Sequence, residues 1–296
     1  MVVKQSTKNL PTGVLWSLLT LIVLMAIPVY AAADTSPESF NKLKKRLTAD
    51  GFNEEQILAL YRQSDVRFDS RSVGLFFIHS ESKLNYGQFA TPKSIRKARK
   101  YQETHAQSLA KTEAAYGVDK DVITAIILVE TRLGERLGKS LVFNALSTMA
   151  ALKESQARQH LWELIPEERR LPKERFEQKA NQKSAWAYKE LKALLTYTLP
   201  AGIDPTAIRG SYAGAMGICQ FMPSNIGPLA ADGNDDGRID LFNHEDAIAS
   251  VAKYLRHHGW KDGQDYDKAF KVVRRYNNSR PYAETILTIA KHLKDT

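Results

Sequence analysis

The stretch Val122–Val129 constrains the fold more than any other part of the chain. Its residues are apolar or β-branched and, placed on a helix, they cover most of the circumference, which is typical of a core helix. Asp119 stands where such a helix would begin, and Gly134 and Gly138 stand where helices end. The sequence therefore predicts a core helix in this segment.

Helical periodicity extends over most of the chain. Apolar residues recur at three- and four-residue spacing in residues 39–52, 53–63 and 94–117, and no sustained alternation typical of strands is present. The predicted fold class is therefore mainly α. Residues 151–200 are highly charged and predict an inserted helical subdomain. Four aromatic residues would pack it on the core: Trp162, Phe176, Trp186 and Tyr188.

The chain has 296 residues, of which 43% are apolar and 25% charged, enough for one large core or two modest ones. We expect a leader over residues 1–33, an N-terminal helical region over 34–118, and the main helical core over 119–296. The insertion at about 151–200 interrupts that core.

The first residues resemble an export signal. Lys4 and Lys8 precede an uncharged, mostly apolar run that reaches Ala33, and Ala31–Ala33 offers the small residues that a signal peptidase reads. The alternative is an uncleaved anchor, with residues 14–33 associated with a membrane. Both interpretations place the rest of the chain outside the cytoplasmic membrane, in a periplasm or cell envelope.

The net charge of +9 favours a partner that carries negative charge, such as nucleic acid, anionic lipid or a carboxylate-bearing wall polymer. Removing residues 1–33 still leaves 40 basic and 33 acidic residues. The basic runs 42–46 and 93–100 lack interleaved aromatic residues and a recognition-helix pattern. They are interpreted as solvated helix faces, and no nucleic acid is expected.

Cys219 is the single cysteine, so no intrachain disulfide can form and stability must come from packing. A nucleophilic role would need a nearby histidine and an electropositive setting. The interpretation favoured here is a small buried hydrophobic residue.

Glu130 is the first candidate for chemistry. It follows the apolar run directly and shares a helix face with Ile126 and Ile127, where desolvation would raise its pKa. The negative end of the helix dipole acts in the same direction. Such a Glu could hold a proton near neutral pH, as a general acid must. The alternative is a structural ion pair with Arg132, Arg136 or Lys139.

The segment Gly210–Asn225 is rich in glycine and alanine, which permits close backbone approach. It also carries neutral polar groups, among them Ser211 and Gln220, and this mixture suits a sugar-binding groove. Tight helix packing is the alternative. Because residues 205–231 contain no acid, this part of the chain cannot supply a second catalytic carboxylate.

Residues from Asp232 onward resemble an EF-hand loop. The candidate Ca²⁺ ligands stand at loop positions 1, 3, 5 and 7, with Gly237 at position 6. Position 12 is Asn243 instead of Glu, so an extended loop could close on Asp246. A polar surface loop without metal is the alternative. The candidate ligands are Asp232, Asn234, Asp236, Arg238 through its carbonyl, and Asp246.

These segments, in this order, resemble the lytic murein transglycosylase B family. The matching stretches are "GVDKDVITAIILVETRLGERLGK", "GSYAGAMGICQFMPSN", "DGNDDGRIDLFNHEDAIASVAKYL" and "RRYNNSRPYAETILTIA". The likeness covers most of residues 40–293 and is weaker before the first stretch and in 151–200. It implies a lysozyme-like helical catalytic core, with the inserted helical subdomain and the EF-hand-like loop.

The resemblance also assigns residue roles. Glu130 matches the family's single catalytic acid and base, Ser211 matches the serine beside it, and the calcium loop matches through Asp246. The glycan-binding positions are Gln220, Tyr254, Tyr276, Asn277 and Tyr282. Three residues depart from the family: Leu133 replaces the usual tryptophan, and Ile218 and Cys219 replace Tyr-Gly.

The expected activity is cleavage of peptidoglycan between N-acetylmuramic acid and N-acetylglucosamine, leaving a 1,6-anhydro end. The enzyme would be a monomer that acts on glycan strands, with Ca²⁺ as a structural ion. The alternatives are a lysozyme-type muramidase that consumes water and a non-catalytic wall-binding protein.

Overall fold

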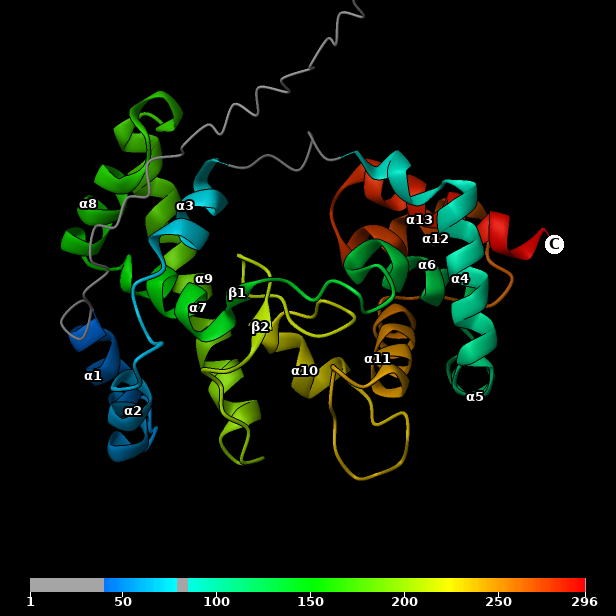
Figure 1. The fold of residues 1–296 in the computed structure, drawn as a ribbon, viewed down its shortest axis with the longest axis horizontal. Coiled ribbons are helices and arrows are strands. Elements are labelled where there is room, and N and C mark those ends of the chain that lie inside the picture. Colours follow the sequence, from blue (N-terminus) through cyan, green and yellow to red (C-terminus); the bar gives the residue numbers. More distant parts are fainter. Residues whose placement is uncertain (1–39, 79–84, 296) are drawn as a thin grey trace, which may run out of the picture. The chain divides into compact units, whose positions relative to one another are not determined.

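The computed structural model describes residues 40–78 and 85–295. The described residues are mostly helical, so the predicted mainly α class is confirmed (Figure 1). The first elements are α1 (Asn41–Ala49), α2 (Glu54–Tyr61), α3 (Ser70–Ile78), η3 (Tyr86–Phe89), α4 (Pro92–Thr104), α5 (Ala106–Tyr116), α6 (Lys120–Thr131) and β1 (Ser140–Leu141).

The remaining elements follow in the second half of the chain. They are α7 (Val142–Ala151), α8 (Ser155–Leu164), η4 (Glu167–Arg169), α9 (Lys173–Thr198), β2 (Arg209–Gly210), α10 (Pro223–Leu229), α11 (His244–His257), α12 (Tyr266–Tyr276) and α13 (Arg280–Lys294). Helix α6 packs against α13, α4 and α11, while α7 packs against α9.

Helix α6 is the predicted core helix. Every residue of Val122–Val129 is buried, and Ile123, Ile126 and Ile127 have no exposed surface. Burying such side chains contributes about 1.5–3 kcal/mol each. The sequence pattern therefore identified the most enclosed helix of the site correctly.

The start of α6 differs from the prediction in one detail. Asp119 is the N-cap residue, but its side chain accepts no capping hydrogen bond. The backbone N–H of Lys120 donates instead to Oε1 of Glu113, 3.0 Å away. The cap is therefore supplied by the preceding helix α5.

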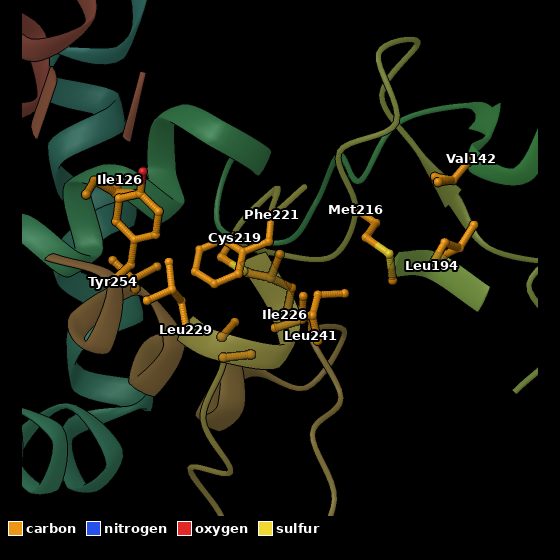
Figure 2. Close-up of a cluster of buried hydrophobic side chains, with 14 of the residues drawn as sticks. Ile126, Val142, Leu194, Met216, Cys219, Phe221, Ile226, Leu229, Leu241 and Tyr254 are labelled. Carbon is orange, nitrogen blue, oxygen red and sulfur yellow. The ribbon is translucent and has the colours of Figure 1, made fainter. Parts of the chain in front are cut away.

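The buried core continues from α6 into the segment Gly210–Asn225. Cys219 and Phe221 lie between Ile126 of α6 and Ile226 of α10 (Figure 2). The ring of Phe221 lies 5.6 Å from that of Tyr254 on α11. The segment is thus held by apolar contacts on both sides.

Helices α8 and α9 form the region predicted as an insertion. Phe176 and Tyr188 of α9 are buried, and the ring of Trp162 on α8 lies 5.0 Å from that of Phe176. The ring of Trp186 is only partly buried and stacks on Phe76 of α3. This region therefore packs on α3 and α7 through the aromatic residues identified from the sequence.

Two very short strands join the end of the α6 loop to the start of the groove segment. Strand β1 pairs antiparallel with β2, Ser140 opposite Gly210. Met216 then forms bridges to Gly210 and Phe221. Strands of two residues carry no periodic pattern, so the sequence could not reveal them.

The leader predicted over residues 1–33, including the membrane-association alternative for 14–33, lies outside the described residues. Within the described ranges, no helix has the length and apolar character needed to cross a membrane.

Candidate functional site

Glu130 is the last but one residue of α6 and is half-buried. The chain turns sharply behind it, because Arg132 and Leu133 both adopt left-handed backbone conformations, with φ of 53° and 66°. Consecutive non-glycine residues in this region are unusual and cost energy. The guanidinium of Arg132 donates to Oε1 of Gln88 at 2.6 Å and lies over the ring of Phe89. Arg132, one of the three predicted alternative partners of Glu130, is thus directed toward η3.

Glu130 lies in a hollow of about 240 Å³. The hollow brings together three predicted site residues, Glu130, Asn277 and Tyr282. Glu130 is the one acidic residue among the described residues that line it. Among the residues that the structure describes, the lining is Asn85, Tyr86, Gln88, Phe89, Val129, Glu130, Asn277 and Tyr282.

The phenol of Tyr282 contacts Glu130 directly. Its hydroxyl donates to Oε1 of Glu130 at 2.6 Å, within the range of a charge-assisted hydrogen bond. Burial, and then the nearby Glu130 carboxylate, raise the pKa of Tyr282 well above its usual range. Tyr282 therefore keeps its proton near neutral pH and acts as a donor that fixes the carboxyl group.

Two backbone carbonyls tie the groove segment to the last residue of α6 and to the last residue of α12. The hydroxyl of Thr131 donates to the carbonyl of Ile218 at 2.8 Å, and that of Tyr276 donates to the carbonyl of Cys219 at 2.6 Å. Both carbonyls belong to the pair that departs from the family pattern. Because these hydrogen bonds use backbone carbonyls, they do not depend on which side chains stand at positions 218 and 219.

Several predicted glycan-binding groups already have protein partners. The hydroxyl of Tyr254 donates to the carbonyl of Arg275, and the amide nitrogen of Gln220 donates to the carbonyls of Leu137 and Gly217. Tyr254 and Tyr276 lie ring against ring, with centroids 4.8 Å apart. Gln220, Tyr254 and Tyr276 are not among the described residues that line the hollow, so their role in glycan binding stays a prediction.

The hydroxyl of Ser211 forms hydrogen bonds with the backbone of its own loop. Its Oγ accepts the backbone N–H groups of Ala213 and Ala215, at 3.2 and 3.0 Å. This arrangement holds the turn that follows β2. A role for Ser211 beside Glu130 stays a prediction.

Sequence reasoning missed one wall of the hollow, the four residues contributed by η3 and its preceding residue. Asn85, Tyr86, Gln88 and Phe89 combine aromatic rings with neutral amides. The same composition identified the segment Gly210–Asn225 as a sugar groove, so this criterion could have found "NYGQF". The ring of Tyr86 meets the edge of Tyr282 at 5.9 Å.

The far end of the groove segment is held by a buried acid that the sequence did not indicate. Glu190 of α9 accepts the backbone N–H of Ser224 at 2.9 Å and its hydroxyl at 2.8 Å. Glu190 is 3% exposed. These hydrogen bonds satisfy a carboxylate that would otherwise be costly to bury.

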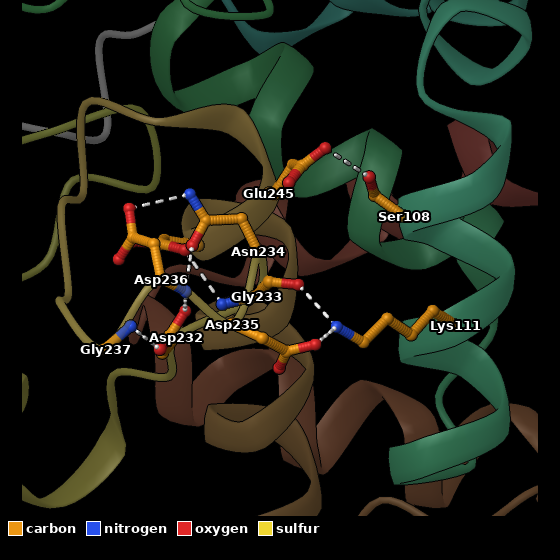
Figure 3. A network of polar contacts seen from close by, with 10 residues as sticks. Ser108, Lys111, Asp232, Gly233, Asn234, Asp235, Asp236, Gly237 and Glu245 are labelled. Carbon is orange, nitrogen blue, oxygen red and sulfur yellow. Dashed lines mark hydrogen bonds and ion pairs between the residues drawn. The ribbon is translucent and has the colours of Figure 1, made fainter.

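The predicted calcium loop is compact and crosslinked by hydrogen bonds (Figure 3). Oδ2 of Asp232 accepts the N–H of Gly237 at 2.8 Å, and Oδ1 of Asp236 accepts that of Arg238 at 2.8 Å. Gly237 has φ of 82°, which supplies the sharp turn needed at position 6.

The closing acid, Asp246, is buried and bonded to the loop backbone. Its two oxygens accept N–H groups from Gly233 and Asp240, at 2.8 and 2.7 Å. Asn243, at position 12, caps α11 through the N–H of Glu245. In the described ranges, no group of three or more acid, histidine or cysteine side chains is arranged to hold a metal. The loop has oxygen donors and a sharp turn at Gly237, and the carboxylate of Asp246 binds backbone N–H groups.

The thiol of Cys219 is fully buried. Burial raises its pKa to about 12. A thiol with so high a pKa is protonated at neutral pH and is a poor nucleophile. This agrees with the interpretation of Cys219 as a small hydrophobic residue.

A family model described as the transglycosylase SLT domain matches residues 35–269. The chain is 34% identical over 176 residues to membrane-bound lytic murein transglycosylase B of Escherichia coli. That alignment covers 60% of this chain and 41% of the relative, so the chain matches less than half of the relative's length.

Solved structures show the same fold. The soluble lytic transglycosylase SltB1 of Pseudomonas aeruginosa has a TM-score of 0.70 and 25% identity, over 86% of this chain and 97% of that one. The Escherichia coli lytic transglycosylase Slt35, solved in complex with calcium, has a TM-score of 0.65 and 21% identity. That match covers 88% of this chain and 93% of Slt35.

Proposed function

The chain belongs to the transglycosylase SLT domain family, and from this premise we propose that it is a lytic transglycosylase of peptidoglycan. The bond that it cleaves is the β-1,4 link between N-acetylmuramic acid and N-acetylglucosamine. The observation that carries the proposal is the hollow around Glu130, the one acid among the described residues that line it. Its carboxyl group is fixed by Tyr282 and surrounded by neutral polar and aromatic groups.

The first step uses Glu130 as an acid. Oε1 accepts the hydrogen bond of the Tyr282 hydroxyl, so the acidic proton belongs on Oε2, which gives it to the glycosidic oxygen. The bond from that oxygen to C1 of muramic acid then breaks, and positive charge develops at C1. The N-acetyl group of the sugar stabilises that charge, so no second carboxylate is required.

The second step uses the same residue as a base. Ionised Glu130 takes the proton of the C6 hydroxyl of muramic acid, whose oxygen closes on C1. A 1,6-anhydro ring forms, water is not consumed, and Glu130 regains its proton. Tyr282 stabilises the ionised carboxylate between the two steps through its hydrogen bond.

Digestion of purified sacculi tests this function. Mass spectrometry of the released muropeptides should show fragments that lack one water relative to hydrolytic products. Hydrated ends alone would identify a lysozyme-type muramidase, and no release would favour a wall-binding protein.

Replacing Tyr282 with Phe removes one hydroxyl and keeps the ring against Tyr86. Turnover should fall about tenfold, because the carboxyl group loses the donor that orients it and stabilises its charged form. Initial rates of muropeptide release measure this effect. Tyr266→Phe, at an exposed tyrosine, is the control. Equal rates for both variants would remove Tyr282 from the mechanism.

Calcium is proposed as a structural ion of the loop from Asp232 to Asp246, with oxygen donors from Asp232, Asn234 and Asp236. Their chemistry and the turn at Gly237 support it. The ion would hold the loop against α11 and take no part in the reaction.

Saturating Ca²⁺ should stabilise the protein by about 2 kcal/mol, and a chelator should reverse this gain. Thermal melting with and without Ca²⁺ measures it. Asp232→Asn should lose the response. Asp235→Asn, at position 4 of the loop and paired with Lys111, should keep it. A melting temperature indifferent to chelator would contradict the proposal.

The proposed location is the periplasm or cell envelope, with residues 1–33 as signal or anchor. The apolar run before Ala33 supports export. The proposed partner is the glycan strand, bound by a monomer.

A further inference from the structure

Three aromatic rings from three separate parts of the chain meet on the surface. Phe76 of α3 stacks on Trp186 of α9, with centroids 6.3 Å apart and planes 17° apart. Tyr212 of the groove segment meets Phe76 edge to face at 6.5 Å. All three are partly exposed. The cluster therefore connects α9 to the start of the groove segment.

Two lysines of α9 lie over these rings. The ammonium nitrogen of Lys183 is 5.1 Å from the ring centroids of both Phe76 and Trp186. That of Lys179 is 5.3 Å from the ring centroid of Phe76 and donates to the Phe76 carbonyl at 3.3 Å. Cation–π contacts at such distances hold a lysine in place without neutralising it.

These lysines differ from others on the same helix. Lys173 pairs with Glu177, and Lys192 pairs with Asp50. Within residues 40–78 and 85–295, neither Lys179 nor Lys183 forms an ion pair with an acid. The aromatic rings hold the two ammonium groups in place, and no acid among the described residues neutralises their charge.

The same turns of α9 line a shallow surface hollow, here called the α9 hollow. The described residues that line it are Arg175, Gln178, Lys179, Gln182 and Lys183. Desolvation, followed by the charges of Lys183 and Arg175, lowers the pKa of Lys179. An anion in the α9 hollow would relieve this repulsion, and the two amides can bond to peptide groups.

The groove segment links the α9 hollow to the reacting acid. Its Ile218 and Cys219 carbonyls bind Thr131 and Tyr276 beside Glu130, while its Tyr212 touches the aromatic cluster. The groove segment therefore contacts both the aromatic cluster, over which Lys179 and Lys183 lie, and the end of the helix that carries Glu130.

We propose that the α9 hollow binds the acidic peptide stem that branches from a muramic acid of the glycan strand. Carboxylates of the stem would contact Lys179 and Lys183, and its amide bonds would contact Gln178 and Gln182. This inference rests on the proposed function, because it takes murein as the ligand. It assigns recognition of the peptide to residues distant from the cleaved bond.

Binding of fluorescent glycan fragments, with and without peptide stems, tests the proposal. The full chain carries Glu130→Gln so that the ligand is not consumed. Lys179→Gln with Lys183→Gln should weaken binding of the stem-bearing fragment about tenfold, as expected for two charge-assisted contacts at a partly exposed site. Binding of the stem-free fragment should not change.

Three further variants distinguish specific binding in the α9 hollow from non-specific attraction to the positive charge of the protein. Lys153→Gln with Lys189→Gln removes two exposed lysine charges elsewhere and should leave binding of both fragments unchanged. Lys179→Arg with Lys183→Arg should restore most of the affinity. Phe76→Leu keeps the charges but removes the ring beneath them, and should weaken stem binding in part.

Loss of affinity for both fragments alike, or for neither, would overturn the proposal. Each variant's melting temperature shows whether it is folded. Failure of the proposed function gives a different result: wild-type digests would lack anhydro ends, while stem-dependent binding could still be present.

Discussion

Glu130→Gln is expected to lose about a thousandfold or more of its turnover, because one residue supplies both the acid and the base of the reaction. Glutamine can accept the Tyr282 hydrogen bond through its amide oxygen, but it can neither give a proton to the glycosidic oxygen nor take one from the C6 hydroxyl. Rates of muropeptide release from purified sacculi measure the loss.

The matched control is Glu135→Gln. Glu135 lies on the loop that follows α6, where it is exposed and paired with Lys97. This variant removes the same charge and should keep wild-type turnover. Both variants should melt near the wild-type temperature, since Glu130 is half-buried at a helix end. Substantial turnover in folded Glu130→Gln would mean that another group provides the acid.

Gly138→Ala is expected to destabilise the fold by more than about 4 kcal/mol. Gly138 has φ of 102°, and a Cβ there would lie 2.0 Å from the carbonyl oxygen of Gly210. The obstacle is backbone, so no side-chain rotation relieves it. Equilibrium denaturation measures the cost. The substitution would separate β1 from β2 and release the groove segment from the loop behind Glu130.

Gly259→Ala separates the two causes of the destabilisation, which are the left-handed backbone conformation and the steric clash of the new Cβ. Gly259 has φ of 97° but would place its Cβ in open space. Its free energy of unfolding should therefore fall only by the cost of placing alanine in the left-handed conformation, about 1–2 kcal/mol. Equal losses at the two positions would show that the contact between Gly138 and Gly210 is not tight in solution.

The sequence predicted those parts of the molecule that depend on local pattern. The apolar circumference of Val122–Val129 identified the core helix, and Asp119 lies at its N-cap position as expected. Glu130 was singled out because a carboxylate follows an apolar helix directly. Each of these signals lies within a few turns of one helix.

The contacts that build the hollow could not be predicted in this way. Tyr282 lies 152 residues from Glu130. Its glycan-binding role was inferred from the family resemblance. No residue near Tyr282 in the sequence indicates which carboxyl group its hydroxyl contacts. The wall from Asn85 to Phe89 and the buried Glu190–Ser224 pair likewise depend on tertiary packing. Helical periodicity places residues on a face but does not say what that face meets.

The most direct test of the central claim is cleavage of defined glycan strands by wild-type protein in water labelled with heavy oxygen. Mass spectrometry then shows whether the new muramic acid end contains solvent oxygen. The mechanism built on Glu130 predicts anhydro ends that lack one water and carry no label, because the C6 oxygen closes the ring. Labelled, hydrated ends would contradict it and show that the site is hydrolytic.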